Sequence, residues 1–223
     1  MTDQDVLNSM RRDWDERARK NARHFVASSR ETWSDEEFFR SGTAEVQDIV
    51  EKELDSIARG RSPESLRALE IGCGAGRMTM SLSRIFGRVA AVDVSQEMIA
   101  HARVALRDRS NVELQVNNGC DLSMFTDESF DFAISAIVFQ HIPKHSIVEN
   151  YIRETWRVLR PDSVFKFQLQ GVPIPEKDAN TWVGVGFTED RIQGVVERCG
   201  FQITATSGAG TQYYWLTCLK PAG

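Results

Sequence analysis

The sequence lacks features that define several large classes of protein. No apolar run approaches the roughly 18–20 residues of a membrane-spanning helix, and the N-terminus has no apolar signal core. Acidic residues outnumber basic ones, 32 to 27, which gives a net charge of −5. A general basic surface for nucleic acid is therefore not expected. These absences predict a cytoplasmic protein that acts on neither membranes nor nucleic acid.

Cysteine is also sparse, and its spacing excludes common structural roles. The four cysteines form no CxxC pair and no metal-ligand pattern, so free thiols are expected and no metal site is predicted. They are Cys73, Cys120, Cys199 and Cys218. Internal repeats and low-complexity tracts are absent as well. A chain of 223 residues then allows one domain of about 150–200 residues and an appendage.

The most informative stretch begins with an apolar run, Leu66 to Ile71, that predicts a short buried strand. Gly72, Gly74 and Gly76 follow at alternate positions, and a helical pattern of apolar residues comes next. A strand, a glycine-rich turn and a helix form the first unit of nucleotide-binding α/β folds, where a ligand approaches bare backbone at a helix N-terminus. Arg77 stands where the dinucleotide fingerprint G-x-G-x-x-G would require glycine.

Two carboxylates near this turn indicate the kind of ligand. Glu70 precedes the glycines, and a carboxylate there suits an ammonium or sulfonium group better than a pyrophosphate. Asp93 ends a second predicted strand, 88–93, at a spacing from Gly76 where related folds bind ribose hydroxyls. A carboxylate can accept two hydroxyl hydrogens side by side. The alternative, that Asp93 only caps a helix, is weaker because Ser95 can supply that cap.

The residues 69–76 resemble motif I of the class I S-adenosylmethionine-dependent methyltransferases, (V/L)-(L/D)-(D/E)-x-G-x-G-x-G. The resemblance extends over roughly residues 66–219. It implies a Rossmann-like α/β fold with a seven-stranded, mostly parallel sheet of order 3-2-1-4-5-7-6 and helices on both faces. We expect an N-terminal helical cap over residues 1–60 and a catalytic domain over 61–223.

The resemblance also assigns residues to the cofactor, S-adenosylmethionine. In this assignment Met98 lies near the adenine. Either Asn118, whose side-chain oxygen can accept from an amine, or Asp121 contacts the adenine, and the two registers remain open. The full set of expected cofactor residues is Glu70, Gly72, Cys73, Gly74, Gly76, Asp93, Val94, Met98, Asn118, Gly119, Cys120, Asp121 and Ala136.

The acceptor side is expected after the fourth and fifth strands. The apolar run 129–139 predicts the fourth strand, and Gln140 and His141 follow it at the edge where ligands bind in open α/β sheets. His141 is the candidate general base, although it can instead satisfy backbone groups. The 17-residue segment 171–187 has no periodicity and predicts a functional loop. Its Trp182 and Phe187 are, with Gln140, candidate substrate contacts.

The N-terminal residues predict helices rich in aromatic side chains. Residues 3–25 form an amphipathic pattern, which indicates either a helix laid on the domain or a lid in which Trp14 closes on substrate. Ser34 and Glu37 form a capping box for a short helix, which Gly42 is expected to break. Thr43 then caps a second helix that runs to Arg59. We hypothesise that residues 1–60 and the loop 171–187 together roof an apolar acceptor pocket.

The remaining elements follow from periodicity. Strands are expected at 112–116 and 163–168, and helices at 146–159 and 188–199. The last two strands, 201–207 and 212–219, are separated by a short turn and must pair as an antiparallel hairpin. Asp162 follows Pro161, where the resembling family usually has glycine.

The pattern as a whole predicts methyl transfer to a small-molecule acceptor. Oxygen is slightly favoured over nitrogen, because no Asn-Pro-Pro-Tyr-type tetrapeptide follows the fourth strand. Two alternatives remain: a protein that binds S-adenosylmethionine or S-adenosylhomocysteine without catalysis, and an NAD(P)-dependent oxidoreductase. Glu70 and Arg77 count against the oxidoreductase.

Overall fold

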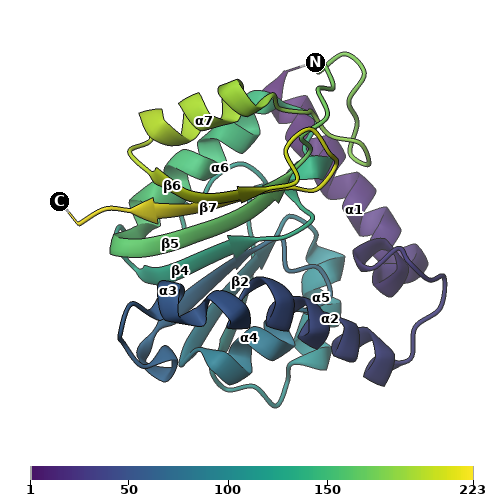
Figure 1. Cartoon of the computed structure of the whole chain (residues 1–223). Helices are drawn as coiled ribbons and strands as arrows, with labels where there is room; N and C mark the ends of the chain where they lie inside the picture. The colour runs from purple at the N-terminus through teal and green to yellow at the C-terminus, as the bar shows by residue number, and fades with distance from the viewer. Residues whose placement is uncertain (1, 223) are drawn as a thin grey trace. The chain divides into compact units, whose positions relative to one another are not determined.

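The computed structural model describes residues 2–222, in which seven strands and seven α-helices alternate along most of the chain (Figure 1). The strand order is β3-β2-β1-β4-β5-β7-β6. β1, β2 and β3 pair in parallel, as do β4 and β5, whereas β7 is antiparallel to both β5 and β6. The predicted order and the antiparallel hairpin at the end of the chain are therefore confirmed.

The chain divides into two compact units. The first unit comprises Arg11–Val116 and the second comprises Met1–Met10 together with Asn117–Gly223. Helix α1 supplies residues to both units. Its bounds are Asp3–Val26. No helix in the described part of the chain is long and apolar enough to cross a membrane.

The first unit holds the glycine-rich turn between a short strand and a short helix. Ser95 caps α5 by accepting from the amide of Met98, as predicted. Its elements are α2 (Asp35–Ile49), a 3₁₀ turn (Glu51–Glu53), α3 (Leu54–Ala58), a second 3₁₀ turn (Pro63–Ser65), β1 (Arg67–Ile71), α4 (Thr79–Ile85), β2 (Arg88–Asp93), α5 (Gln96–Ala105) and β3 (Val112–Val116).

The second unit has an aromatic core beside β5. The rings of Phe165 and Phe167 lie on alternate positions of that strand and both contact Phe139, and all three side chains are fully buried. Its elements are β4 (Phe130–Ser135), a 3₁₀ turn (Phe139–His141), α6 (His145–Val158), β5 (Leu159–Leu169), α7 (Glu189–Arg198), β6 (Gln202–Ser207) and β7 (Tyr214–Lys220).

The structure corrects the expectation for residues 34–59. The capping box of Ser34 and Glu37 is present, but α2 continues through Gly42 to Ile49, and Thr43 bonds to Phe39 and Ser81 rather than capping a new helix. The helix tolerates the glycine because of a tertiary contact. A Cβ atom at position 42 would lie 2.2 Å from the carbonyl oxygen of Arg77, so only glycine allows α2 to approach that backbone.

Two further expectations need adjustment in the second unit. The fourth strand ends at Ser135 rather than at residue 139, because the chain turns at Ile137, whose φ of +58° is rare for a β-branched residue. β5 starts at Leu159, four residues earlier than expected. Asp162 has a φ of +65°, so it takes up the left-handed conformation that a glycine would adopt more easily.

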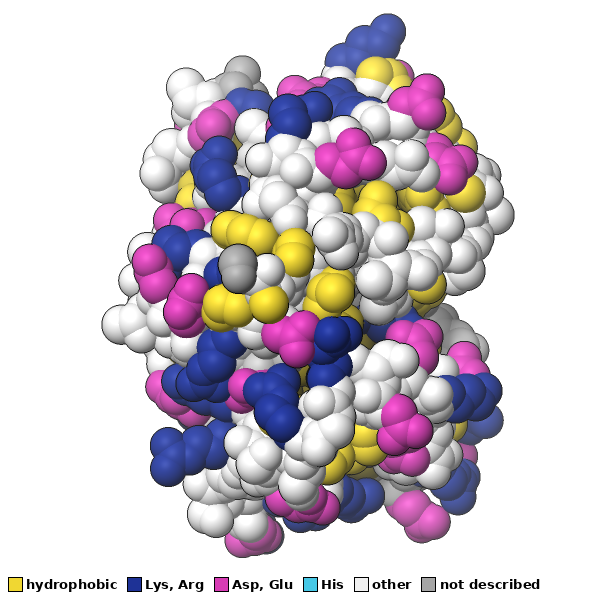
Figure 2. Space-filling view, turned by 60° about the vertical axis from the view of Figure 1, so that its left-hand side comes forward, with side chains coloured by type: hydrophobic (Ala, Val, Ile, Leu, Met, Phe, Trp, Pro, Cys, Tyr) yellow, Lys and Arg dark blue, Asp and Glu magenta, His cyan; other side chains and the backbone are white. Residues whose placement is uncertain are grey.

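Charged side chains of both signs are interspersed over the face shown in Figure 2, with smaller apolar patches between them. This mixture agrees with the modest net charge of −5. The four cysteines are free, as the sequence predicts.

Replacing Gly42 by alanine tests the contact between α2 and the backbone of Arg77. Alanine favours a helix by about 1 kcal/mol, but overpacking costs about 1–3 kcal/mol. We therefore expect Gly42→Ala to lower the free energy of unfolding, measured in urea. Gly194→Ala in α7 is the control, because its Cβ would meet only the flexible end of Arg198 at 3.1 Å. That variant is expected to be as stable as the wild type or more so. Equal stability of the two variants would contradict the packing argument.

Candidate functional site

The glycine-rich loop after β1 folds back onto the end of β2. The amides of Gly72 and Cys73 donate to the carbonyl of Val92 at 2.7 and 3.0 Å, and the amide of Gly74 donates to Asp93 Oδ2 at 2.9 Å. The three glycines all have positive φ, of 79°, 52° and 82° at positions 72, 74 and 76. Their conformation therefore explains the alternate spacing of glycine in the sequence.

Two of these glycines also allow close packing. A Cβ atom on Gly76 would lie 2.8 Å from Leu106 Cδ1 and 3.3 Å from Ala102 Cβ, so Gly76 brings the loop against α5. A Cβ atom on Gly74 would lie 2.6 Å from Val26 Cγ2 in α1. Helix α1 thus ends directly against the loop.

Asp93 is held by backbone amides on both of its oxygens. Oδ2 accepts from Gly74, and Oδ1 accepts from the amide of Ser95 at 2.9 Å. Burial raises the pKa of Asp93 to about 6, against these hydrogen bonds, which lower it. The side chain keeps part of its surface exposed. An oriented and partly exposed carboxylate at the end of β2 can accept hydrogen bonds from neighbouring hydroxyl groups.

Glu70 provides a second carboxylate in the same loop region. Its side chain is 5% exposed, and Oε2 accepts from the hydroxyl of Thr79 at 2.6 Å. Burial, with a further contribution from the charge of Asp93, raises the pKa of Glu70 to about 7. Burial and the same two carboxylates raise the pKa of the Cys73 thiol. Negative charge is therefore concentrated in a poorly solvated place.

The charge of Arg77 lowers the pKa of Glu70, but it does not outweigh the effect of burial. Its guanidinium donates to Glu45 of α2, and its side chain is 8% exposed. The position that the dinucleotide fingerprint would give to glycine therefore carries a link between α2 and the loop. A pyrophosphate would meet two carboxylates here, whereas a cation would be stabilised by them. The residues present thus fit S-adenosylmethionine, which carries sulfonium and ammonium charges.

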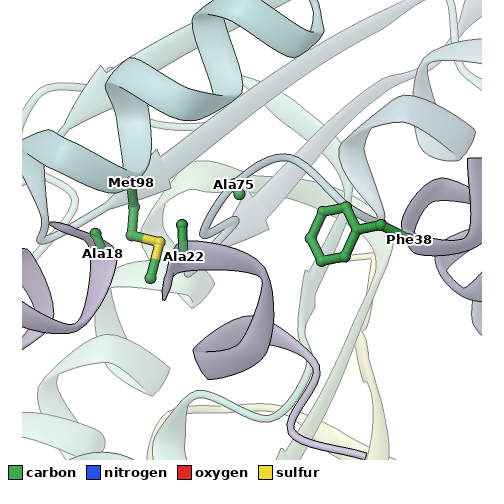
Figure 3. Packing of buried hydrophobic residues seen from close by; sticks show 5 residues of the cluster. All are labelled: Ala18, Ala22, Phe38, Ala75 and Met98. Carbon is green, nitrogen blue, oxygen red and sulfur yellow. The ribbon is translucent and has the colours of Figure 1, made fainter. Parts of the chain in front are cut away.

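Helix α1 packs on the residues expected near the adenine. Met98 is 1% exposed and belongs to a buried cluster with Ala18 and Ala22 of α1, and with Ala75 and Phe38 (Figure 3). Figure 3 shows the Met98 side chain directed at the two alanines. Small side chains on this face of α1 allow its backbone to approach α5.

The aromatic residues of the N-terminal helices pack against the same cluster. Trp14, Trp33 and Phe39 lie partly buried against it, and Arg17 lies 4.7 Å above the ring of Trp14. Their packing agrees with the interpretation of α1 as a cover on the domain. A contact between Trp14 and substrate stays a prediction.

The segment after β3 lies in the second unit, and hydrogen bonds from its own side chains to its backbone hold its conformation. Asn118 is exposed, and its Oδ1 accepts from the amides of Cys120 and Asp121, both at 3.0 Å. The oxygen proposed to accept from the adenine amine therefore already has two donors. Asp121 accepts from the amide of Ser123 at 3.0 Å, and its pKa is lowered because hydrogen bonds outweigh its partial burial. Both residues stay candidates, as do Val94, Gly119 and Ala136.

His141 lies in the 3₁₀ turn after β4, and both of its ring nitrogens have partners. Nδ1 lies 2.6 Å from the carbonyl oxygen of Trp182, and Nε2 lies 3.2 Å from Nε2 of Gln140. A carbonyl can only accept, so Nδ1 carries the hydrogen and Nε2 accepts from the Gln140 amide. Gln140 Oε1 in turn accepts from Gln168 at 2.9 Å. The ring is thus held in one tautomer, and the structure brings together His141, Gln140 and Trp182.

The loop 171–187 is attached to α6 by a second histidine, the first residue of that helix. His145 Nε2 lies 3.0 Å from the carbonyl of Gly186, and its Nδ1 lies 3.1 Å from Glu176. Phe187 is fully buried with its ring 4.8 Å from His145, whereas Trp182 is 38% exposed. Of the two predicted substrate contacts on this loop, Trp182 therefore presents more surface.

Sequence reasoning missed three residues of the first unit. Thr79 could have been noticed as a hydroxyl in the first turn after the glycine loop. The contact of Asp15 with Ser95, described below, leaves no signal, because the two residues are 80 positions apart. The approach of Val26 to Gly74 has no signal either.

Comparisons with known proteins agree on the family. The family described as "Methyltransferase domain" matches residues 69–167. A ubiquinone biosynthesis O-methyltransferase from Xanthomonas oryzae pv. oryzae is 28% identical over 109 residues, which are 48% of this chain and 44% of that protein. A malonyl-[acyl-carrier protein] O-methyltransferase from Bacillus cereus is 32% identical over 133 residues, 57% and 47% respectively. The chain thus spans about half the length of these curated relatives.

Solved structures share the fold. A SAM-dependent methyltransferase from Methanosarcina mazei superposes with a TM-score of 0.60 at 23% identity, covering 72% of this chain and 94% of that one. The DhpI–SAH complex superposes with a TM-score of 0.65 at 18% identity and covers 99% of both chains.

The segment 69–167 thus matches the methyltransferase domain family, and it carries the resemblance to the class I S-adenosylmethionine-dependent methyltransferases. The matched segment begins within β1, just before the glycine-rich loop, and ends within β5. It contains the two carboxylates Glu70 and Asp93 of the first unit and the 3₁₀ turn Phe139–His141 of the second. α1, α2 and the loop 171–187 lie outside it, so the segments predicted to select the acceptor are those that the family match does not cover.

Gly74→Ala tests the contact between α1 and the loop. The variant forces a left-handed backbone on alanine, which costs about 1–2 kcal/mol, and it drives Cβ into Val26. We expect weaker binding of S-adenosylhomocysteine by calorimetry. Adding Val26→Ala removes the clash but not the backbone cost, so partial recovery is expected. Gly60→Ala is the control, because its φ of +79° is similar and no atom lies within 4 Å of its Cβ. No recovery in the double variant would disprove the contact.

Glu70→Gln tests the buried charge. The folded pKa of about 7 lies above the ordinary value of 4.5, so the contribution of Glu70 to stability is fully present below about pH 4.5 and is lost as the pH rises through 7. Glutamine does not ionise. The stability of the variant relative to wild type should therefore increase between pH 4.5 and 8, by an amount on the order of 3 kcal/mol. A relative stability that does not change with pH would show that Glu70 ionises without penalty.

Proposed function

We propose that this protein is a methyltransferase that transfers the methyl group of S-adenosylmethionine to a small-molecule acceptor, with oxygen as the favoured nucleophile. The observation that carries the proposal is the arrangement around Asp93. Its carboxylate is oriented by the amides of Gly74 and Ser95 beside a second buried carboxylate, Glu70. That arrangement suits a ligand with both a ribose diol and positive charge.

Each residue has a distinct task in this proposal. The cofactor supplies a methyl group activated on sulfonium sulfur. Asp93 accepts hydrogen bonds from the ribose hydroxyls, and the glycine loop holds the Asp93 carboxylate through the amide of Gly74. Glu70 contributes negative charge, which favours a cationic ligand over a neutral one. The chain must also align the acceptor atom behind the methyl carbon at about 3 Å. It must exclude bulk water from the site during transfer.

One observation supports an oxygen acceptor, and another supports an acceptor with apolar surface. The names of the Xanthomonas and Bacillus relatives both specify O-methylation. The first acts in ubiquinone biosynthesis and the second on malonyl-[acyl-carrier protein]. In addition, Trp182 and Val183 expose apolar surface on the loop 171–187. A small acceptor with an apolar or aromatic part would be bound by such side chains.

A second candidate function has a specific observation in its favour. An oxygen nucleophile needs a base, and both ring nitrogens of His141 are already engaged, one by Trp182 and one by Gln140. A chain without a dedicated base would serve as a binding protein for S-adenosylmethionine or S-adenosylhomocysteine. An acceptor that is already ionised at neutral pH, such as a carboxylic acid or a phenol whose pKa is lowered by its substituents, does not need that base. We therefore favour acidic acceptors.

Calorimetry and an isotope assay test the proposal. S-adenosylmethionine is expected to bind, whereas NAD should not. Asp93→Ala is expected to lose about 1.5–3 kcal/mol, or 10–100-fold in affinity, because a charge-assisted hydrogen-bond pair is removed. Wild-type protein with methyl-labelled cofactor should then label a phenol or a carboxylic acid from a small panel.

The outcomes separate the candidates. Binding without transfer to any panel member would support the binding protein. If Asp93→Ala binds as tightly as wild type while circular dichroism shows an intact fold, Asp93 is not the ribose ligand. Asp55→Ala, which removes a carboxylate from α3 outside the loop, is the matched control and should bind normally.

A further inference from the structure

Helix α1 contacts the turn that follows Asp93. Asp15 Oδ1 accepts from the hydroxyl of Ser95 at 2.6 Å and from the amide of Glu97 at 3.2 Å. One helical turn further along α1, Arg19 donates from Nε and Nη2 to Glu97 Oε1 at 3.1 and 2.9 Å. Two successive turns of α1 thus hold the first turn of α5.

These contacts complete the hydrogen bonding of the turn between β2 and α5. The amide of Ser95 donates to Asp93 Oδ1, and the amide of Met98 donates to Ser95 Oγ at 3.0 Å. The amide of Glu97, between them, donates to Asp15. The first amides of a helix need such acceptors because no carbonyl of the helix itself reaches them. Ser95 is fully buried, so loss of Asp15 would leave its hydroxyl hydrogen without this acceptor.

The connection to the cofactor loop runs through one residue. Ser95 is held on its hydroxyl by Asp15 and donates its amide to Asp93, whose other oxygen accepts from Gly74. A displacement of Ser95 would therefore change the direction of the Asp93 carboxylate. The exposed ion pair of Arg19 adds little energy by itself, so Asp15 is the principal contact.

We propose that Asp15 is a positioning residue for Asp93: by holding Ser95 and Glu97 from α1, it fixes the turn that orients the Asp93 carboxylate and thereby couples the docking of α1 to cofactor affinity. This inference rests on the proposed function in so far as it concerns affinity. The positioning itself is a property of the protein without cofactor.

Asp15 also acts through its charge. Its carboxylate contributes to the raised pKa of Asp93, behind the larger effect of burial. The other titratable groups coupled to Asp93 are Glu70 on β1 and Cys73 in the loop. Replacing Asp15 by asparagine keeps an oxygen that can accept both hydrogen bonds but removes the charge, so the two effects can be separated.

Three variants test the proposal: Asp15→Ala, Asp15→Asn and the control Glu16→Ala, which removes an adjacent exposed carboxylate. Three properties are measured, namely S-adenosylhomocysteine affinity by calorimetry, amide hydrogen exchange at Glu97 and Met98 in the free protein, and the titration of the Asp93 carboxyl group by NMR.

Asp15→Ala is expected to bind about tenfold more weakly at pH 8 and to exchange faster at both amides. Asp15→Asn should stay within about threefold of wild type in affinity at pH 8, because its hydrogen bonds are kept. Its Asp93 should titrate at a lower pH than in wild type. Glu16→Ala should match wild type in affinity and exchange.

The proposal is overturned if Asp15→Ala keeps wild-type affinity and exchange, or if it lowers only the melting temperature. It is also overturned if Asp15→Asn is as impaired as Asp15→Ala. A wild-type protein that does not bind S-adenosylhomocysteine would refute the proposed function instead. In that case faster exchange in Asp15→Ala and the shifted Asp93 titration in Asp15→Asn still support the positioning role, and their absence refutes it.

Discussion

The hydrogen bond from the Gly74 amide to Asp93 joins the two halves of the candidate cofactor site in the first unit. It connects the loop after β1 to the end of β2, and Gly74 takes part in it with a positive φ. The same carboxylate accepts from Ser95 at the start of α5. The loop, the strand and the helix are therefore oriented by one acidic side chain, and α1 reaches this arrangement through Asp15 and Val26.

The energetic consequence is that the free protein is not at its most stable. Glu70 and Asp93 are both buried enough for their pKa values to rise to about 7 and 6. At neutral pH the fold holds negative charge in a poorly solvated region, which a cationic ligand would relieve. Such a conflict between stability and binding is typical of functional sites. It also explains why neutral replacements can strengthen the fold and weaken binding.

Local patterns predicted most of the fold. The capping residues Ser34 and Ser95 could be recognised because a cap depends on neighbours within three residues. The strand order followed from the family resemblance, and the final hairpin from its short turn. The predicted helix break at Gly42 was wrong. A glycine is required within α2 because the helix packs against the backbone of Arg77, 35 positions later.

The candidate site was predictable in its residue types but not in its contacts. Glu70, Asp93 and the glycines lie together, as expected from motif spacing. The engagement of His141 by Trp182 spans 41 positions, and that of Ser95 by Asp15 spans 80, so neither has a local signal. The first turn of α1 also depends on a partner that is distant in the sequence, and distance in sequence means delay during synthesis. Asp3 pairs with Lys144, and synthesis at roughly 5–20 residues per second places these partners on the order of 10 s apart at the ribosome. The residues at the start of α1 thus leave the ribosome well before Lys144, and a chaperone that shields them would meet α1 before β1 to β7 have been synthesised.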